Sequence, residues 1–169
     1  MPEWYTPDDY LDAARRVLGT IDLDPASSVI AQERVKAKKY YSAQQDGLSQ
    51  PWSGRVFLNP PYSADLVGQF TTKLCTSYQS GDVSEAILWV NNAIETGWFQ
   101  EASAAAAAVC FPTGRIKFLD EQGKPGAPLQ GQAALYYGDD VDRFARAFGD
   151  VADIYVRHKI SQPAELAAA

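Results

Sequence analysis

The 169-residue sequence lacks most of the features that mark membrane, secreted and metal-bound proteins. No run approaches the about 20 apolar residues that a membrane-spanning helix needs, so we predict no membrane partner. The first ten residues, MPEWYTPDDY, are acidic and aromatic rather than basic and then apolar, so we expect no export signal and a cytoplasmic location. The two cysteines, Cys75 and Cys110, have no metal-like spacing, and we predict free thiols and no bound metal.

Basic residues are also scarce. The chain has 15 lysines and arginines against 21 aspartates and glutamates, a formal net charge of −6. A protein of this charge repels polyanions as a whole, so tight nonspecific binding to nucleic acid is not expected. The balance counts against a DNA substrate unless a local basic surface offsets it.

What remains is typical of a single globular domain. Hydrophobic residues make up 46% of the chain and charged residues 21%, within the ordinary range for folded proteins. The length is enough for one real core and too short for two ordinary domains. We therefore predict one domain over residues 1–160 and a frayed tail over residues 161–169.

Helix and strand patterns alternate through the first two thirds of the chain. Thr6 is the predicted N-cap of the first helix, with Pro7 at its first position and Gly19 at its end. The predicted elements are helix 6–19, strand 20–24, helix 28–38, strand 55–58, helix 65–80, strand 85–90, helix 96–107 and strand 108–111. This alternation predicts an α/β fold with a mainly parallel sheet covered by helices.

The last third has a different pattern. Residues 115–119 and 132–137 flank a segment rich in glycine and proline, which predicts a hairpin. Helix 141–148 and strand 152–157 are predicted to follow it. The complete prediction is a mixed α/β sheet, mainly parallel, with antiparallel edge strands.

The motif Asn59-Pro60-Pro61-Tyr62 follows the apolar segment RVFL and therefore lies at the carboxyl end of a predicted strand, where α/β folds bind ligands. An exocyclic amine is a poor nucleophile because its lone pair is delocalised. An asparagine oxygen and the carbonyl of the next proline, fixed by rigid proline dihedrals, can each accept one N–H of such an amine. The Tyr62 ring can stack on a planar target. The alternative interpretation is a Pro-Pro turn that only ends a strand beside a packed tyrosine.

Several short motifs occur in an order that resembles the small, phage-type DNA N6-adenine methyltransferases, often called Dam-like. They are WYTP (4–7), LDPAS (23–27), DGL (46–48) with Trp52, FLNPPYS (57–63), WF (98–99) and GRIKF (114–118). The resemblance implies a Rossmann-like methyltransferase domain that binds S-adenosylmethionine, flips an adenine out of DNA and methylates N6. For a phage-encoded enzyme it also implies a location in the cytoplasm of a bacterial host.

The same resemblance implies roles for individual residues. It gives Asn59, Pro60 and Tyr62 the target-amine roles described above, with Pro61 as a rigid spacer. It places the turn Asp24-Pro25-Ala26 at the cofactor, with Asp24 facing the methionyl part. Thr6 and Pro7 match a segment that closes over the cofactor. Asp46 matches the position that meets the adenosine half.

Two departures separate this chain from larger methyltransferases. The turn after the first predicted strand reads DPAS (24–27) and lacks the glycine-rich FxGxG pattern. Only about 35 residues separate Asp24 from Asn59, which leaves little room for an intermediate strand and its ribose-binding acid. Asp24 and Asp46 also have a simpler interpretation, in which each caps a turn beside proline or glycine.

Arg115 and Lys117 alternate with Ile116 and Phe118, so the two basic side chains share one face of the predicted strand. They can meet DNA phosphates near the target base, and a solvated hairpin face explains them equally well.

Three functions fit the sequence. The first is N6 methylation of adenine in DNA. The second keeps the methyl transfer but changes the acceptor, because NPPY also occurs in enzymes that methylate a glutamine amide in protein. Those enzymes usually carry an additional N-terminal helical domain. The third is a non-catalytic module that binds cofactor or DNA, which the acidic balance and the missing glycine turn favour.

Overall fold

The computed structural model describes residues 4–127 and 130–158, and the predicted tail lies outside these ranges. The strands are β1 (Leu23–Asp24), β2 (Lys39–Tyr40), β3 (Gly54–Leu58), β4 (Val83–Asn91), β5 (Ala108–Pro112), β6 (Gln132–Tyr137) and β7 (Ala152–Val156). The α-helices are α1 (Asp8–Leu18), α2 (Val29–Val35), α3 (Ala64–Ser80), α4 (Gly97–Ala105) and α5 (Val141–Phe148). The helices and strands predicted in the first two thirds of the chain are therefore confirmed, with ends that differ by a few residues.

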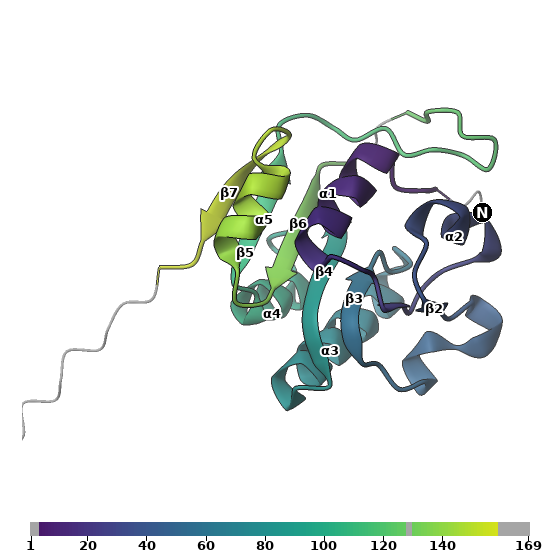
Figure 1. Cartoon of the computed structure of the whole chain (residues 1–169), viewed down its shortest axis with the longest axis horizontal. Coiled ribbons are helices and arrows are strands. Elements are labelled where there is room, and N and C mark those ends of the chain that lie inside the picture. Colours follow the sequence, from purple (N-terminus) through teal and green to yellow (C-terminus); the bar gives the residue numbers. More distant parts are fainter. Residues whose placement is uncertain (1–3, 128–129, 159–169) are drawn as a thin grey trace, which may run out of the picture.

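One seven-stranded sheet carries the fold, in the order β2-β1-β3-β4-β6-β5-β7 (Figure 1). Strands β2, β1, β3 and β4 are mutually parallel. Strand β6 is antiparallel to both of its neighbours, and β7 is antiparallel to β5. The predicted mixed α/β sheet is confirmed, and β7 is an antiparallel edge strand as expected. The prediction is wrong for β6, which is not an edge strand. It pairs with β4 on one side and β5 on the other, and all of its residues are buried.

The predicted hairpin between residues 115–119 and 132–137 is also wrong, because β6 pairs with β4 and β5 instead. The first segment forms no regular strand. Its single bridge to the N-terminal segment joins Leu119 to Tyr5, whose N–H donates to the Leu119 carbonyl at 2.8 Å. The alternation that suggested a strand arises because Ile116 is buried in the core while its neighbours face outward.

Two hydrophobic cores cover the two faces of the sheet. In Figure 1, α1 and α5 lie in front of the sheet, and α3 and α4 lie behind it. Successive side chains of β4 point to opposite faces of the sheet, so this strand contributes to both cores. Ile87 and Trp89 pack on the α1 and α5 side, and Leu88 and Val90 pack on the α3 and α4 side. The predicted cover of helices is therefore confirmed, on both faces.

Helix α1 begins at Asp8, with Pro7 as its N-cap and no side-chain cap. The prediction of Thr6 as N-cap is wrong because the Thr6 hydroxyl is buried and engaged elsewhere, as described below. Gly19 ends the helix with a positive φ of 75°, a conformation that favours glycine.

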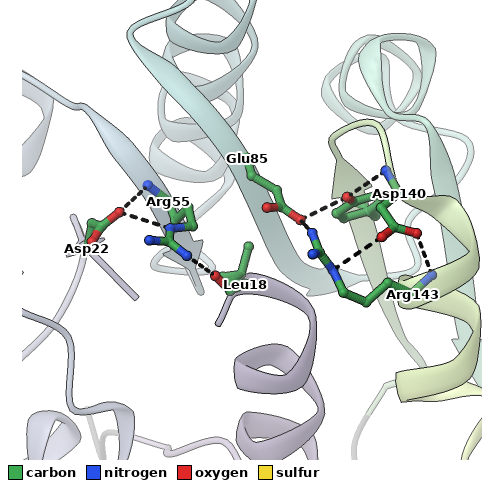
Figure 2. A network of polar contacts seen from close by, with 7 residues as sticks. Leu18, Asp22, Arg55, Glu85, Asp140 and Arg143 are labelled. Carbon is green, nitrogen blue, oxygen red and sulfur yellow. Dashed lines mark hydrogen bonds and ion pairs between the residues drawn. The ribbon is translucent and has the colours of Figure 1, made fainter. Parts of the chain in front are cut away.

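Two ion-pair networks lie at the amino edge of the sheet (Figure 2). The NPPY motif follows β3 and therefore lies at the opposite, carboxyl edge. In one network, the Asp22 carboxylate accepts from the backbone N–H of Arg55, and the Arg55 guanidinium donates to the Leu18 carbonyl at the end of α1. In the other, Glu85 of β4 pairs with Arg143 of α5 at 2.7 Å. These contacts join α1 and α5 to the sheet at its amino edge.

The strand order reverses at β1. From β1 the chain passes through α2 to β2 on one side, and then crosses to β3 on the other. In open α/β sheets ligands bind outside the carboxyl ends of the strands at such a switch point. The carboxyl ends of β1 and β3 carry the two predicted motifs, Asp24-Pro25-Ala26 and Asn59 to Tyr62.

Candidate functional site

Asn59 follows the last residue of β3 and is half-buried at the carboxyl edge of the sheet. Its Nδ2 donates to the Thr6 Oγ1 at 3.3 Å. Thr6 is 4% exposed, although it lies in the short segment before α1. The structure therefore brings two predicted site residues together, and the contact holds the Asn59 amide in one orientation with its oxygen turned away from Thr6.

The Asn59 oxygen faces Tyr62. The Tyr62 hydroxyl lies 2.9 Å from the Asn59 Oδ1 and 3.2 Å from the Gln132 Oε1. Gln132 is the first residue of β6, is buried, and pairs across the ladder with Asn91, the last residue of β4. Its Nε2 donates to the Asn91 Oδ1 at 2.6 Å. A continuous chain of polar side chains thus runs along the edge from Thr6 to Asn91.

Sequence reasoning missed Gln132 and Asn91. A signal was present, since both are polar residues at the ends of otherwise apolar segments, AALYY and AILWV. Using that signal required the position of β6 beside β4, and the predicted hairpin placed it elsewhere.

Tyr62 has an exposed ring and a shielded hydroxyl. The side chain is 43% exposed, whereas burial raises the pKa of its hydroxyl above the ordinary value. The hydroxyl therefore stays protonated and acts as a donor near neutral pH. Pro60 is buried and Pro61 is exposed, so the two prolines carry the chain outward from the sheet edge to Tyr62.

Asp24 ends β1 and is buried, with 3% of its surface exposed. Its Oδ1 accepts from the Ala26 N–H at 3.4 Å, and its Oδ2 accepts from the Gln32 Nε2 at 2.9 Å. Burial raises the pKa of Asp24 to about 6, opposed by hydrogen bonds to Ser27, Ala26 and Gln32. Asp24 caps its own turn, as the simpler interpretation predicts, and presents a carboxylate of unusual basicity at the switch point.

Asp46 lies beside this turn. It is exposed and left-handed, with φ 51°, and its Oδ1 accepts from the Leu48 N–H at 3.3 Å at the start of the 3-10 helix η2 (Gly47–Ser49). A side chain at position 47 would place its Cβ 1.9 Å from the Pro25 carbonyl oxygen, so only glycine allows this approach. The segments predicted to meet the cofactor, around Pro25 and around Asp46, are in contact.

Lys73 of α3 holds the segment that follows Asp46. Its Nζ donates to the Leu48 carbonyl at 2.5 Å and to the Gln50 carbonyl at 2.6 Å. The same ammonium lies 5.2 Å from the centre of the Trp52 ring. Burial lowers the pKa of Lys73.

The intermediate strand for which the sequence leaves little room is present as β2, with only two residues.

Arg115 and Lys117 are both exposed on the connection between β5 and β6, and Ile116 between them is buried. Figure 1 shows this connection passing over the end of the sheet at which α1 begins. The two basic side chains lie in an irregular segment instead of a strand. Their use in binding DNA stays a prediction.

Among the described residues no three His, Cys, Asp or Glu side chains form a group suited to a metal ion. In the same part of the chain no helix is both long and apolar enough to cross a membrane. Cys75 and Cys110 are free and buried, as predicted, and burial raises the pKa of both thiols.

The family model of the DNA N-6-adenine-methyltransferases (Dam) matches residues 2–134, which include every predicted site residue. The chain belongs to this family. The mixed α/β sheet is the Rossmann-like methyltransferase fold, and the activity that goes with the Dam family is methylation of N6 of adenine in DNA. A search of curated proteins found no match to the chain.

Proposed function

We propose that this protein transfers a methyl group from S-adenosylmethionine to N6 of an adenine that is flipped out of DNA and held by Asn59, Pro60 and Tyr62. The observation that carries the proposal is the position of the Asn59 amide. Its nitrogen donates to Thr6 and its oxygen lies at the carboxyl edge of the sheet beside the Tyr62 hydroxyl, within a chain of the Dam family.

The Asn59 oxygen and the Pro60 carbonyl would each accept one N–H of the target amine. Two acceptors, one for each N–H, favour a pyramidal nitrogen, whose lone pair is available for attack on the methyl group. The amide is too weak a base to take the proton that N6 loses after transfer, so this proton passes to water. Catalysis would therefore depend on orientation and hydrogen bonding rather than on a protein base.

Tyr62 would supply the stacking surface. Its exposed ring lies three residues beyond Asn59, and stacking of a base on an aromatic ring is worth about 1–3 kcal/mol. Extruding a paired base costs a few kcal/mol, and stacking in the pocket offsets part of that cost. Arg115 and Lys117 would contact phosphates beside the target.

The residues at the switch point fit S-adenosylmethionine. The buried carboxylate of Asp24 suits a cationic ammonium group, and the exposed carboxylate of Asp46 suits ribose hydroxyls. Thr6, Pro7 and the Pro25-Ala26 turn would complete the enclosure. When bound, the cofactor supplies a methyl group already activated on a sulfonium, so the protein needs no nucleophile of its own.

The decisive experiment measures transfer of a labelled methyl group from S-adenosylmethionine to unmethylated DNA, with the product nucleoside identified by mass spectrometry. Asn59→Ala should reduce the rate by about 100-fold or more, the usual effect of losing one group that stabilises the transition state. Asn92→Ala removes an amide from an exposed position to which the proposal assigns no role, and it should retain wild-type activity.

The possible results separate the three functions inferred from the sequence. N6-methyladenine formed by the wild type and lost in Asn59→Ala establishes the reaction and the motif together. Label found in protein and absent from DNA would replace adenine with a glutamine amide as acceptor. If no label is transferred while calorimetry shows binding of cofactor or DNA, the protein is a binding module and the proposal is wrong.

A further inference from the structure

The Tyr62 hydroxyl lies within hydrogen-bonding distance of two acceptors, the Asn59 Oδ1 at 2.9 Å and the Gln132 Oε1 at 3.2 Å. A phenol carries one proton, so it can donate to only one of them at a time. Burial raises the pKa of this hydroxyl, which keeps the proton in place near neutral pH. When the proton points to Asn59, the Asn59 oxygen accepts a hydrogen bond from Tyr62. When it points to Gln132, the Asn59 oxygen has no bond from Tyr62.

Gln132 is held so that its oxygen stays directed at Tyr62. The residue is 5% exposed, and its Nε2 donates to the Asn91 Oδ1 at 2.6 Å, which fixes the orientation of the amide. Asn91 and Gln132 are direct partners in the ladder between β4 and β6, so the backbone supports this contact. The acceptor is therefore built into the sheet and does not depend on a loop.

The Asn59 oxygen is the atom that the proposed function needs for the target amine. The amide oxygen has two lone pairs, and a hydroxyl that donates to one of them occupies the space beside it and competes with an incoming N–H for this acceptor. When the hydroxyl donates to Gln132 instead, the Asn59 oxygen is available to the amine and Tyr62 still has a partner. A buried donor left without any acceptor would be unfavourable.

We propose that Gln132 is a positioning residue for methyl transfer, which accepts the Tyr62 hydroxyl when the target base binds and so frees the Asn59 oxygen for the target amine. This inference rests on the proposed function. It assigns Asn91 an indirect part, since that residue only orients the Gln132 amide.

The test compares Gln132→Met, which keeps the length of the side chain without its acceptor, with Gln132→Glu, which keeps an acceptor oxygen. Steady-state methylation of DNA should show kcat about five- to tenfold lower for Gln132→Met, the effect of one hydrogen bond. The KM for S-adenosylmethionine should be unchanged. Gln132→Glu should recover at least half of the wild-type kcat once the Asn91 amide turns over, so that its Nδ2 donates to the second carboxylate oxygen. Gln130→Met makes the same change at an exposed position and serves as the control.

A double-mutant cycle with Tyr62→Phe separates positioning from a merely structural effect. Without the Tyr62 hydroxyl, Gln132→Met should cause no further loss of kcat. An equal loss in the wild-type and Tyr62→Phe backgrounds would overturn the inference, and so would a Gln132→Met variant with wild-type kcat. If Gln132→Met does not fold, Asn91→Ala releases the Gln132 amide and should show the same non-additivity.

The result also distinguishes this inference from the proposed function. A wild-type protein that forms no N6-methyladenine refutes the proposed function, whatever the variants do. An active wild type with an additive cycle refutes only the part assigned to Gln132.

Discussion

Replacing Asp24 with asparagine should change the pH dependence of stability in a direction that the burial of this carboxyl determines. Burial raises the pKa of Asp24 from 3.8 to about 6 in the folded protein. Between these values the folded state keeps a proton that the unfolded state has released. Wild-type stability therefore falls as the pH rises from about 4 to about 6, and then levels off.

The size of the effect follows from the same two values. At 1.36 kcal/mol per pH unit, the difference between 3.8 and about 6 corresponds to about 3 kcal/mol. Asparagine has no proton to release, so Asp24→Asn should gain this amount relative to wild type between pH 4 and pH 7. The variant also loses the acceptor for Gln32, at a cost of about 1 kcal/mol that is the same at every pH.

Urea denaturation followed by tryptophan fluorescence, at half-unit steps from pH 4 to pH 8, measures the difference in unfolding free energy. Asp22→Asn is the matched control, because a hydrogen bond from Lys38 lowers the pKa of Asp22 and the sign reverses. The gain in stability from Asp22 is complete once the pH exceeds its unfolded value of 3.8, so wild type and Asp22→Asn should differ by a nearly constant amount from pH 4 to pH 8. If wild type and Asp24→Asn give parallel stability curves from pH 4 to pH 7, the argument from burial is refuted.

Two further predictions concern the carboxyl edge. Thr6→Val keeps the shape of the side chain and removes the acceptor for the Asn59 Nδ2, so kcat for DNA methylation should fall about five- to tenfold while Thr6→Ser stays close to wild type. Equal kcat values for the two variants would show that the contact does not position Asn59. The double variant with Arg115→Ala and Lys117→Ala should lose one phosphate contact at each position. In anisotropy titrations with DNA, the slope of the log binding constant against the log salt concentration should therefore become shallower by about 2. Replacing Arg146, exposed on α5, should leave the slope unchanged, and an unchanged slope in the double variant would remove both residues from the DNA interface.

Local sequence patterns predicted the helices and the central strands because each pattern reflects burial of one element. The apolar segment before Asn59 and the apolar segment AILWV correspond directly to strands that supply the two cores. The position of Asn59 at a sheet edge followed from the two prolines that end β3. These inferences needed no knowledge of which strands are neighbours.

Pairing was the part that the sequence did not reveal. Residues 115–119 alternate between basic and apolar side chains, and residues 132–137 are mostly apolar, so each segment looks like a strand. Nothing in either segment indicates that β6 inserts between β4 and β5. The same limit hid Gln132, whose partner Asn91 lies 41 residues earlier in the chain. Thr6 was misassigned for a related reason, since its hydroxyl bonds to a residue 53 positions away instead of to its own helix.

The interior place of β6 has a consequence for biosynthesis. Strand β5 is made before both of its sheet neighbours, β6 and β7, so a nascent chain that ends before residue 132 leaves β4 and β5 with open edges. The chain of polar side chains from Thr6 to Asn91 at the carboxyl edge also stays incomplete until Gln132 enters the sheet. Phe144 and Phe148 of α5 then close the core around Trp89, beyond the residues matched by the Dam family model. Activity should therefore arise only after β6 and α5 have been made, and fragments that end within the family region should be prone to pair with other chains.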